Sequence, residues 1–85
     1  MKYYIGKIME RNGDFEYSDT YLFATKGDPH KVAKKIAKNW RGTGEWDARH
    51  DGWWNDHTLI FNNGYTEIPE ADYIVLNKYI PTIPA

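Results

Sequence analysis

The sequence predicts a small α+β domain in which an antiparallel sheet of three or four strands carries an amphipathic helix on one face. Two observations lead to this prediction: an Asn-Gly turn separates two aromatic, strand-like runs, and one helical stripe of apolar residues follows them. A later strand pattern and a short helical pattern complete the order ββαβ(β)α. Such elements bury their apolar faces as two layers, with both helices on one face of the sheet, so we expect residues 1–85 to form a single domain.

The first predicted element is a β-hairpin. Residues 2–10 and 15–25 are both rich in aromatic and branched apolar side chains, and Asn12-Gly13 lies between them. A type I′ turn needs positive φ at both central residues, which Asn-Gly adopts readily. Alternate positions of the first strand are apolar on both faces, so we expect a helix on one side and aromatic residues coating the other.

The second predicted element is a helix over residues 29–41. Asp28 is a suitable N-cap, and Pro29 fits the first helical position because the N–H that it lacks would have no partner there. Gly42 is a natural left-handed terminator just past the last turn. The apolar stripe at helical spacing consists of Val32, Ala33, Ile36, Ala37 and Trp40.

The second half of the chain contains weaker signals. Residues 57–61 and 65–68 are predicted as short strands, and Asn62-Asn63-Gly64 as the tight turn between them. The segment before them, residues 42–57, shows neither a helical nor a strand period. We therefore treat that segment as a loop.

The last predicted element is a short helix over residues 70–79. Pro69 and two acidic residues precede apolar side chains at helical spacing, which is typical of a helix N-terminus. The run Tyr73-Ile74-Val75-Leu76 also has high β propensity, so a final strand is the alternative. Because Pro81 and Pro84 cannot continue regular structure, residues 81–85 are expected to form a C-terminal tail.

Composition limits the functions to consider. The chain has no cysteine, which excludes disulfides and thiolate metal sites, and its net charge of −1 gives no general attraction to nucleic acid or membranes. No segment approaches the roughly 20 apolar residues that span a bilayer. We expect a cytoplasmic protein, stabilised by a core to which its aromatic residues, 16% of the chain, contribute strongly.

The segment 42–57 is the most informative part of the sequence because it holds three of the four tryptophans. Connecting segments run over the surface, so these indoles either fold back onto a thin core or form a binding surface. If the backbone is extended, Trp53 and Trp54 point in opposite directions, and only one can easily enter the same core. We predict a partner-binding site with Trp46, Trp53 and Trp54 as anchors and Asp47, Arg49 and Asp51 as a polar rim.

A basic helix face supports a second interpretation. Five cations on one side of a helix could contact phosphates, although such a face is also ordinary for a solvated helix. The twelve acidic residues of the chain weigh against nucleic acid as the partner. The candidate phosphate contacts of this alternative are Lys31, Lys34, Lys35, Lys38 and Arg41.

Metal and catalytic chemistry are poorly supported. His50 and His57 lie among acidic residues, but their spacing matches no known metal-binding motif. Ser18 is the only serine, and neither a nucleophile elbow nor a phosphate-binding loop is present. We therefore predict a protein that is not an enzyme, with no metal ion and no cofactor.

The layout of hairpin, basic helix, aromatic loop and strand pair is similar to that of many small bacterial and phage proteins, some of which are stoichiometric inhibitors of host defence machinery. No motif identifies a family. The sequence predicts a small non-catalytic interaction module that acts through a protein partner, or through self-association, as an inhibitor or regulator. A weak nucleic-acid-binding domain that uses helix 29–41 is the alternative.

Overall fold

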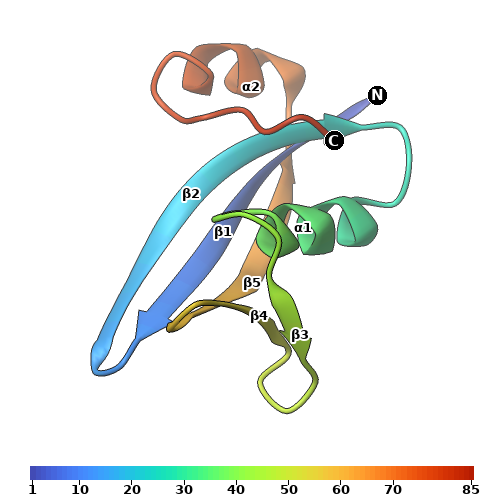
Figure 1. Cartoon of the computed structure of the whole chain (residues 1–85). Helices are drawn as coiled ribbons and strands as arrows, with labels where there is room; N and C mark the ends of the chain where they lie inside the picture. The colour runs from blue at the N-terminus through green and yellow to red at the C-terminus, as the bar shows by residue number, and fades with distance from the viewer.

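The computed structural model describes residues 1–85 and has five strands and two helices (Figure 1). The strands form one antiparallel sheet in the order β2-β1-β5-β4-β3. The α+β class and the antiparallel sheet agree with the sequence prediction, but the sheet has five strands instead of three or four. The elements are β1 (Lys2–Asn12), β2 (Phe15–Thr25), α1 (Pro29–Lys38), β3 (Glu45–Asp47), β4 (Gly52–Asn55), β5 (Thr58–Ile68) and α2 (Glu70–Leu76).

The hairpin of β1 and β2 is confirmed. The two strands pair along their whole length, from Lys2 opposite Thr25 to Asn12 opposite Phe15. Gly13 has φ of +60°, but Asn12 is the last residue of β1 and pairs with Phe15, so the two turn residues are Gly13 and Asp14 instead of the predicted Asn12 and Gly13. This hairpin supplies two of the three long strands of the sheet.

The predicted turn at Asn62-Asn63-Gly64 is wrong: these residues lie inside the continuous strand β5. Ile8 pairs with Asn62 and Gly6 with Tyr65, so two residues of β5 face one residue of β1 in a β-bulge. Gly64 has φ of +99°, and its N–H donates to Oδ1 of Asn62 at 3.2 Å. Bulges and hairpin turns favour the same residue types. Because β5 pairs with the long strand β1 on both sides of Asn63 and Gly64, these residues form a bulge within one strand instead of a turn between two strands.

The expectation that residues 42–57 form a loop is also wrong. They contain β3 and β4, which form a short hairpin at one end of the sheet, with Trp46 directly opposite Trp53. Asp51, with φ of +50°, lies just before β4, and Gly52 is the first residue of that strand. Asp-Gly is a strong hairpin signal, so the sequence did contain evidence for this turn.

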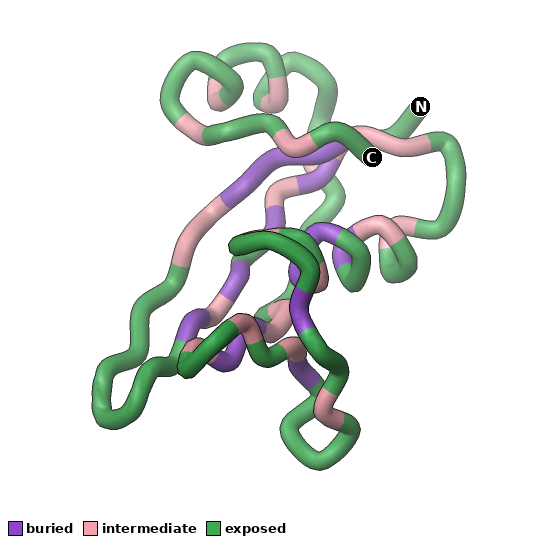
Figure 2. Tube along the Cα trace, in the orientation of Figure 1, coloured by how far each residue is buried: buried purple, intermediate pink, exposed green.

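The core lies between α1 and one face of the sheet (Figure 2). Tyr21 packs over Gly6, where a Cβ atom would lie 2.5 Å from Cζ of Tyr21, so glycine makes room for the ring. Trp40 packs partly buried against the core, as the helical stripe predicts. The buried residues that form this core cluster are Tyr4, Ile8, Tyr21, Phe23, Ala33, Ile36, Ala37 and Ile60.

Helix α1 begins where the sequence predicts and ends earlier. The side chain of Asp28 accepts a hydrogen bond from the His30 N–H at 2.9 Å, which confirms the N-cap. The helix stops at Lys38 instead of residue 41, and the Gly44 N–H donates to the Lys38 carbonyl at 3.0 Å. The chain must turn here to start β3, and Gly42, with φ of +94°, takes part in that turn.

The C-terminal helix is confirmed over Glu70–Leu76, so it ends before the predicted residue 79. Tyr73 packs on Tyr3, with ring centroids 4.7 Å apart. Tyr3 and Tyr4 point to opposite faces of β1, and Tyr4 belongs to the core beneath α1. The second helix therefore lies on the other face of the sheet, instead of sharing a face with α1 as predicted.

The tail that follows α2 runs beside β2. The Leu22 N–H donates to the Pro81 carbonyl at 2.8 Å, and the Ile83 N–H donates to the Leu22 carbonyl at 2.9 Å. The predicted irregular tail is thus attached to the outer strand of the sheet, and Ile83 packs against the core. Neither helix has the length and apolar character needed to cross a membrane.

Candidate interaction site

The hairpin of β3 and β4 presents its three indoles differently. Trp53 is half-buried and packs against the core, whereas Trp46 is 42% exposed and Trp54 is 36% exposed. Because Trp53 and Trp54 are consecutive in a strand, their side chains leave opposite faces of the hairpin. One indole therefore supports the hairpin, and two indoles lie open to solvent.

On the α1 side, the aromatic hairpin and the basic helix meet. The rings of Trp46 and Trp53 have centroids 4.7 Å apart. The Lys34 ammonium lies over the Trp46 ring, 4.4 Å from its centroid, and the Lys38 ammonium lies 5.5 Å from the Trp53 centroid. We call these four residues the lysine–indole surface.

On the opposite side of the hairpin, Asp47 organises the turn. Its Oδ2 accepts hydrogen bonds from Nε1 of Trp54 and pairs with Nδ1 of His50, each at 2.8 Å, and its Oδ1 accepts from the Arg49 N–H at 2.9 Å. The hydrogen bond from Trp54, and to a smaller extent the one with His50, lowers the pKa of Asp47 from 3.8 to about 2. Asp47 therefore holds Trp54 in one orientation.

The remaining predicted rim residues, Arg49 and Asp51, are exposed at the tip of the hairpin. The two histidines of this region do not come together. His50 is bound to Asp47, and His57 lies 3.8 Å from its neighbour Asp56. No three His, Asp or Glu side chains of the chain are grouped so that they could hold a metal ion.

The five predicted cations are not equivalent. Lys31 and Lys35 are exposed, and Lys34 and Lys38 lie over indoles. Arg41 lies beyond the end of α1, where its guanidinium Nε and Nη2 donate to the two carboxylate oxygens of Glu10. Of the five, only Arg41 forms an ion pair.

The partner of Arg41 is a buried carboxylate that sequence reasoning missed. The side chain of Glu10 is 1% exposed. Burial raises the pKa of Glu10, but the hydrogen bonds with Arg41, Asp19 and Trp40 and the positive charge of Arg41 together outweigh burial and lower it. The pKa of Asp19 is raised, first by its hydrogen bond with Glu10 and to a smaller extent by burial. Glu10, Asp19 and Arg41 together connect β1 and β2 to the turn after α1. The sequence did contain a signal for the buried carboxylate, because Glu10 is at an alternate position on the same face of β1 as Tyr4 and Ile8.

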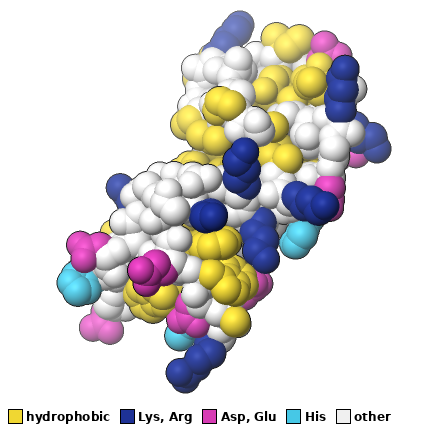
Figure 3. Space-filling view, turned by 45° about the vertical axis from the view of Figure 1, so that its right-hand side comes forward, with side chains coloured by type: hydrophobic (Ala, Val, Ile, Leu, Met, Phe, Trp, Pro, Cys, Tyr) yellow, Lys and Arg dark blue, Asp and Glu magenta, His cyan; other side chains and the backbone are white.

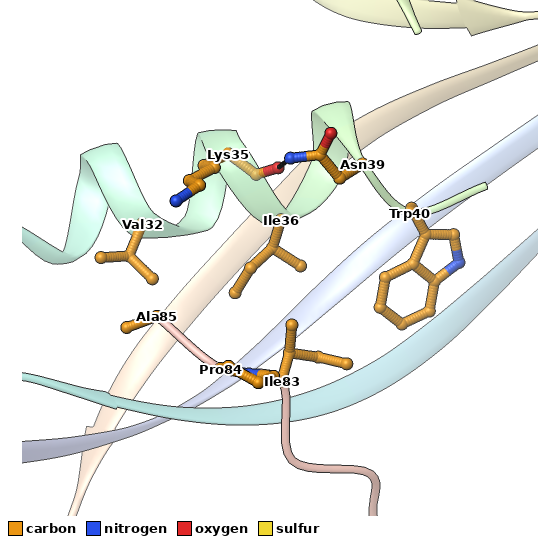
Figure 4. Close-up of a pocket in the computed structure, with 8 residues that line it drawn as sticks. All are labelled: Val32, Lys35, Ile36, Asn39, Trp40, Ile83, Pro84 and Ala85. Atoms are coloured by element: carbon orange, nitrogen blue, oxygen red, sulfur yellow. Dashed lines mark hydrogen bonds between the residues drawn. The ribbon is translucent and has the colours of Figure 1, made fainter. Parts of the chain in front are cut away.

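A concave feature lies between α1 and the tail (Figure 4). It has a volume of about 270 Å³, and Val32, Ile36 and Ile83 point into it. Its polar lining is sparse: Lys35 lies at the rim, and the Asn39 amide is engaged with the Lys35 carbonyl at 3.1 Å. This cavity is a mostly apolar groove with few groups that could orient a ligand.

Comparison with protein-family models, with curated proteins and with solved structures finds no match to this chain.

Proposed function

We propose that the protein is a non-catalytic interaction module that binds a protein partner through the hairpin of β3 and β4. Trp46 and Trp54 are the apolar anchors, and Arg49 and Asp51 form part of the polar rim. One observation carries the proposal: two exposed indoles of the same hairpin are already held by contacts within the protein.

Held indoles favour binding for an energetic reason. Tryptophan is enriched among the residues that dominate binding energy, because its ring is large, rigid and amphipathic. Each side chain that must be immobilised on binding costs about 0.5–1.5 kcal/mol. The Asp47 carboxylate already orients Trp54, and Trp53 together with Lys34 contacts Trp46, so much of this cost is met within the free protein.

The position of the hairpin adds to this argument. β3 is the last strand of the sheet on its side, so the hairpin stands at an edge that no other strand of the chain covers. A strand of only three residues offers little backbone for pairing with another chain. Its side chains, rather than its backbone, are therefore the main contacts available to a partner.

Nucleic-acid binding through α1 is the second candidate. The four lysines of the helix form no ion pair, and two of them lie beside indoles, so cations and aromatic rings share one surface. Base stacking needs an accessible ring face, however. The Trp46 ring already contacts both Lys34 and Trp53, which favours a protein partner.

The proposal is tested with single substitutions in the hairpin. We expect Trp46→Ala and Trp54→Ala to stay folded, as judged by amide NMR spectra, and each to lose at least about tenfold in partner capture from cell extract. Tyr79→Ala is the matched control, because Tyr79 is an aromatic residue that is 80% exposed and lies outside the hairpin. If both tryptophan variants capture a partner as well as wild type does, the hairpin is not the binding site.

A further inference from the structure

We propose that the part of the partner that contacts α1 is an acidic protein segment, whose carboxylates bind the lysine–indole surface. This inference rests on the proposed function and adds the chemistry of the partner. Lys34 and Lys38 would bind the carboxylates, and Trp46 would contact the adjacent apolar atoms. Three features of the protein support this partner: the charge of α1, a small cavity beside Lys34, and the occupied ring face of Trp46.

The charge of α1 is uncompensated. Between Pro29 and Lys38 the helix has four lysines and no acidic residue, and none of these lysines forms an ion pair within the protein. Elsewhere Lys2, Arg11 and Arg41 do form ion pairs with glutamates. Figure 3 shows basic side chains gathered across the middle of one face, above an apolar patch. A complementary partner for such a face is anionic.

The two lysines nearest the hairpin are partly ordered before a partner binds. An ammonium over an indole is attracted by the ring, at about 0.5–1 kcal/mol when the pair is exposed. The ring contacts only one side of the ammonium, so its remaining N–H groups can still donate to a carboxylate. Less side-chain freedom is then lost on binding than for a free lysine such as Lys31.

A small cavity lies between α1 and the hairpin, and Lys34 is the one lysine that lines it. It has a volume of about 130 Å³, which suits a single side chain and not a large ligand. Lys34 and His30 line it from the helix, and Trp46 and Trp53 line it from the hairpin. Asp51 is the one acidic residue in its wall, and no lysine is paired with it. An aspartate or glutamate of the partner therefore finds an unpaired cation here.

The same geometry favours carboxylates over a nucleic-acid strand. A base would have to displace Lys34 or Trp53 from the Trp46 ring before it could stack. A nucleic-acid strand would also bring a continuous row of phosphates past Asp51 in the cavity wall, whereas a protein segment can place a single carboxylate at Lys34.

The test is an NMR titration at low salt with an octaglutamate peptide and, separately, with the eight-nucleotide oligothymidylate. We expect octaglutamate to shift the indole N–H signal of Trp46 and the amides of α1, and the shifts to reverse with salt. The double variant Lys34→Gln/Lys38→Gln should bind the peptide about tenfold more weakly. The matched control is Lys35→Gln/Lys78→Gln, which removes the same charge at two lysines that do not contact indoles and should change affinity less than about twofold.

Three outcomes of this titration would overturn the inference. In the first, octaglutamate causes no shift at Trp46. In the second, both double variants lose the same affinity, so that only net charge matters. In the third, oligothymidylate binds more tightly than octaglutamate and quenches tryptophan fluorescence, which would identify nucleic acid as the ligand.

A capture experiment separates this inference from the proposed function. If Trp46→Ala and Trp54→Ala lose partner capture but Lys34→Glu/Lys38→Glu retains it, the hairpin binds a partner whose contact with α1 is not acidic. If the charge-reversed variant also loses capture while its amide spectrum stays native, the inference is supported. If neither tryptophan variant loses capture, the proposed function itself fails.

Discussion

The two helices have similar amphipathic sequences but are used differently. In α1 the stripe at helical spacing is buried, with Ala33, Ile36 and Ala37 between 0% and 5% exposed. In α2 no residue is buried, and Ile74 and Val75 of its apolar stripe are 58% and 55% exposed. Spacing predicted both helices, but it did not predict which stripe would be covered.

The difference follows from where each helix meets the sheet. Helix α1 lies across β4 and β5 and packs against a broad layer of aromatic and branched residues. Helix α2 is shorter, packs near the start of β1, and contacts it through Tyr73. A two-turn helix at the end of the sheet has little surface to pack against, so only Tyr73 and Leu76 are half-buried and the rest of its apolar stripe faces solvent.

The largest expected effect comes from truncating the buried stripe. Ile36→Ala should lower the free energy of unfolding by about 3 kcal/mol, because it removes buried methylene groups and leaves a cavity. Urea denaturation followed by tryptophan fluorescence measures this change. A loss no greater than that of Ile74→Ala would mean that the two helices are equally packed.

The turn after α1 should be the next most sensitive position. Arg41→Ala leaves Glu10 buried without its cation, and because Arg41 is partly exposed we expect a loss of about 2 kcal/mol at pH 7. The pKa of folded Glu10 lies below its usual value, so the stabilisation is complete above the unfolded pKa and disappears as pH falls through the folded pKa. The raised pKa of Asp19 acts in the opposite direction.

The pH dependence gives this prediction a second measurement. Unfolding curves of wild type and Arg41→Ala should differ most near pH 7 and converge toward pH 2. A gap that stays constant over this range would show that the charge of Glu10 is not what Arg41 stabilises.

Tyr73 is the test of how α2 is attached. Tyr73→Ala removes the contact with Tyr3, and we expect a cost of about 1.5 kcal/mol, smaller than for Ile36 because Tyr73 is only half-buried. Hydrogen exchange should become faster in residues 70–76 and stay unchanged in α1. Equal acceleration in both helices would contradict separate attachment.

The N-terminal caps provide a smaller contrast. Asp28 caps α1 through its side chain, whereas Pro69 precedes α2 with no side-chain cap. Asp28→Ala should cost about 1 kcal/mol, detectable as a lower urea midpoint. Asp28→Asn is the control and should lose much less, because its amide oxygen can still accept from the His30 N–H.

The smallest expected effect is on the exposed stripe of α2. Ile74→Lys should change the free energy of unfolding by less than about 0.5 kcal/mol, since the side chain is more than half exposed. Sedimentation velocity of this variant also addresses self-association. A shift from a larger species to the monomer on substitution would show that the stripe is covered in an assembly.

Local signals identified the elements with strong sequence chemistry. The hairpin signal near Gly13, the cap at Asp28 and the stripe around Ile36 each act within a few residues, and the hairpin, the cap and the buried stripe are confirmed. The bulge at Gly64 and the strands β3 and β4 were missed. A turn and a bulge share residue types, and a three-residue strand is too short to show a period.

The candidate site likewise has one feature that the sequence predicted and others that it did not. The sequence indicated that Trp53 and Trp54 would point in opposite directions, and the structure places them on opposite faces of a hairpin. Their partners could not be predicted, because Lys34 reaches Trp46 and Asp47 reaches Trp54 only after the hairpin has folded against α1. Arg41 was predicted on the basic face of the helix, but it lies beyond the end of α1 and its guanidinium binds the buried carboxylate of Glu10.

The sequence by itself determined the fold class, the first hairpin, the position of both helices and the presence of an unusual tryptophan cluster. These features depend on backbone preferences and on spacing between near neighbours. Tertiary structure alone decided which faces of the helices are covered, that the tryptophan segment joins the sheet, and that lysines and indoles share a surface. Those outcomes depend on contacts between residues distant in the chain, whose energies no local pattern contains.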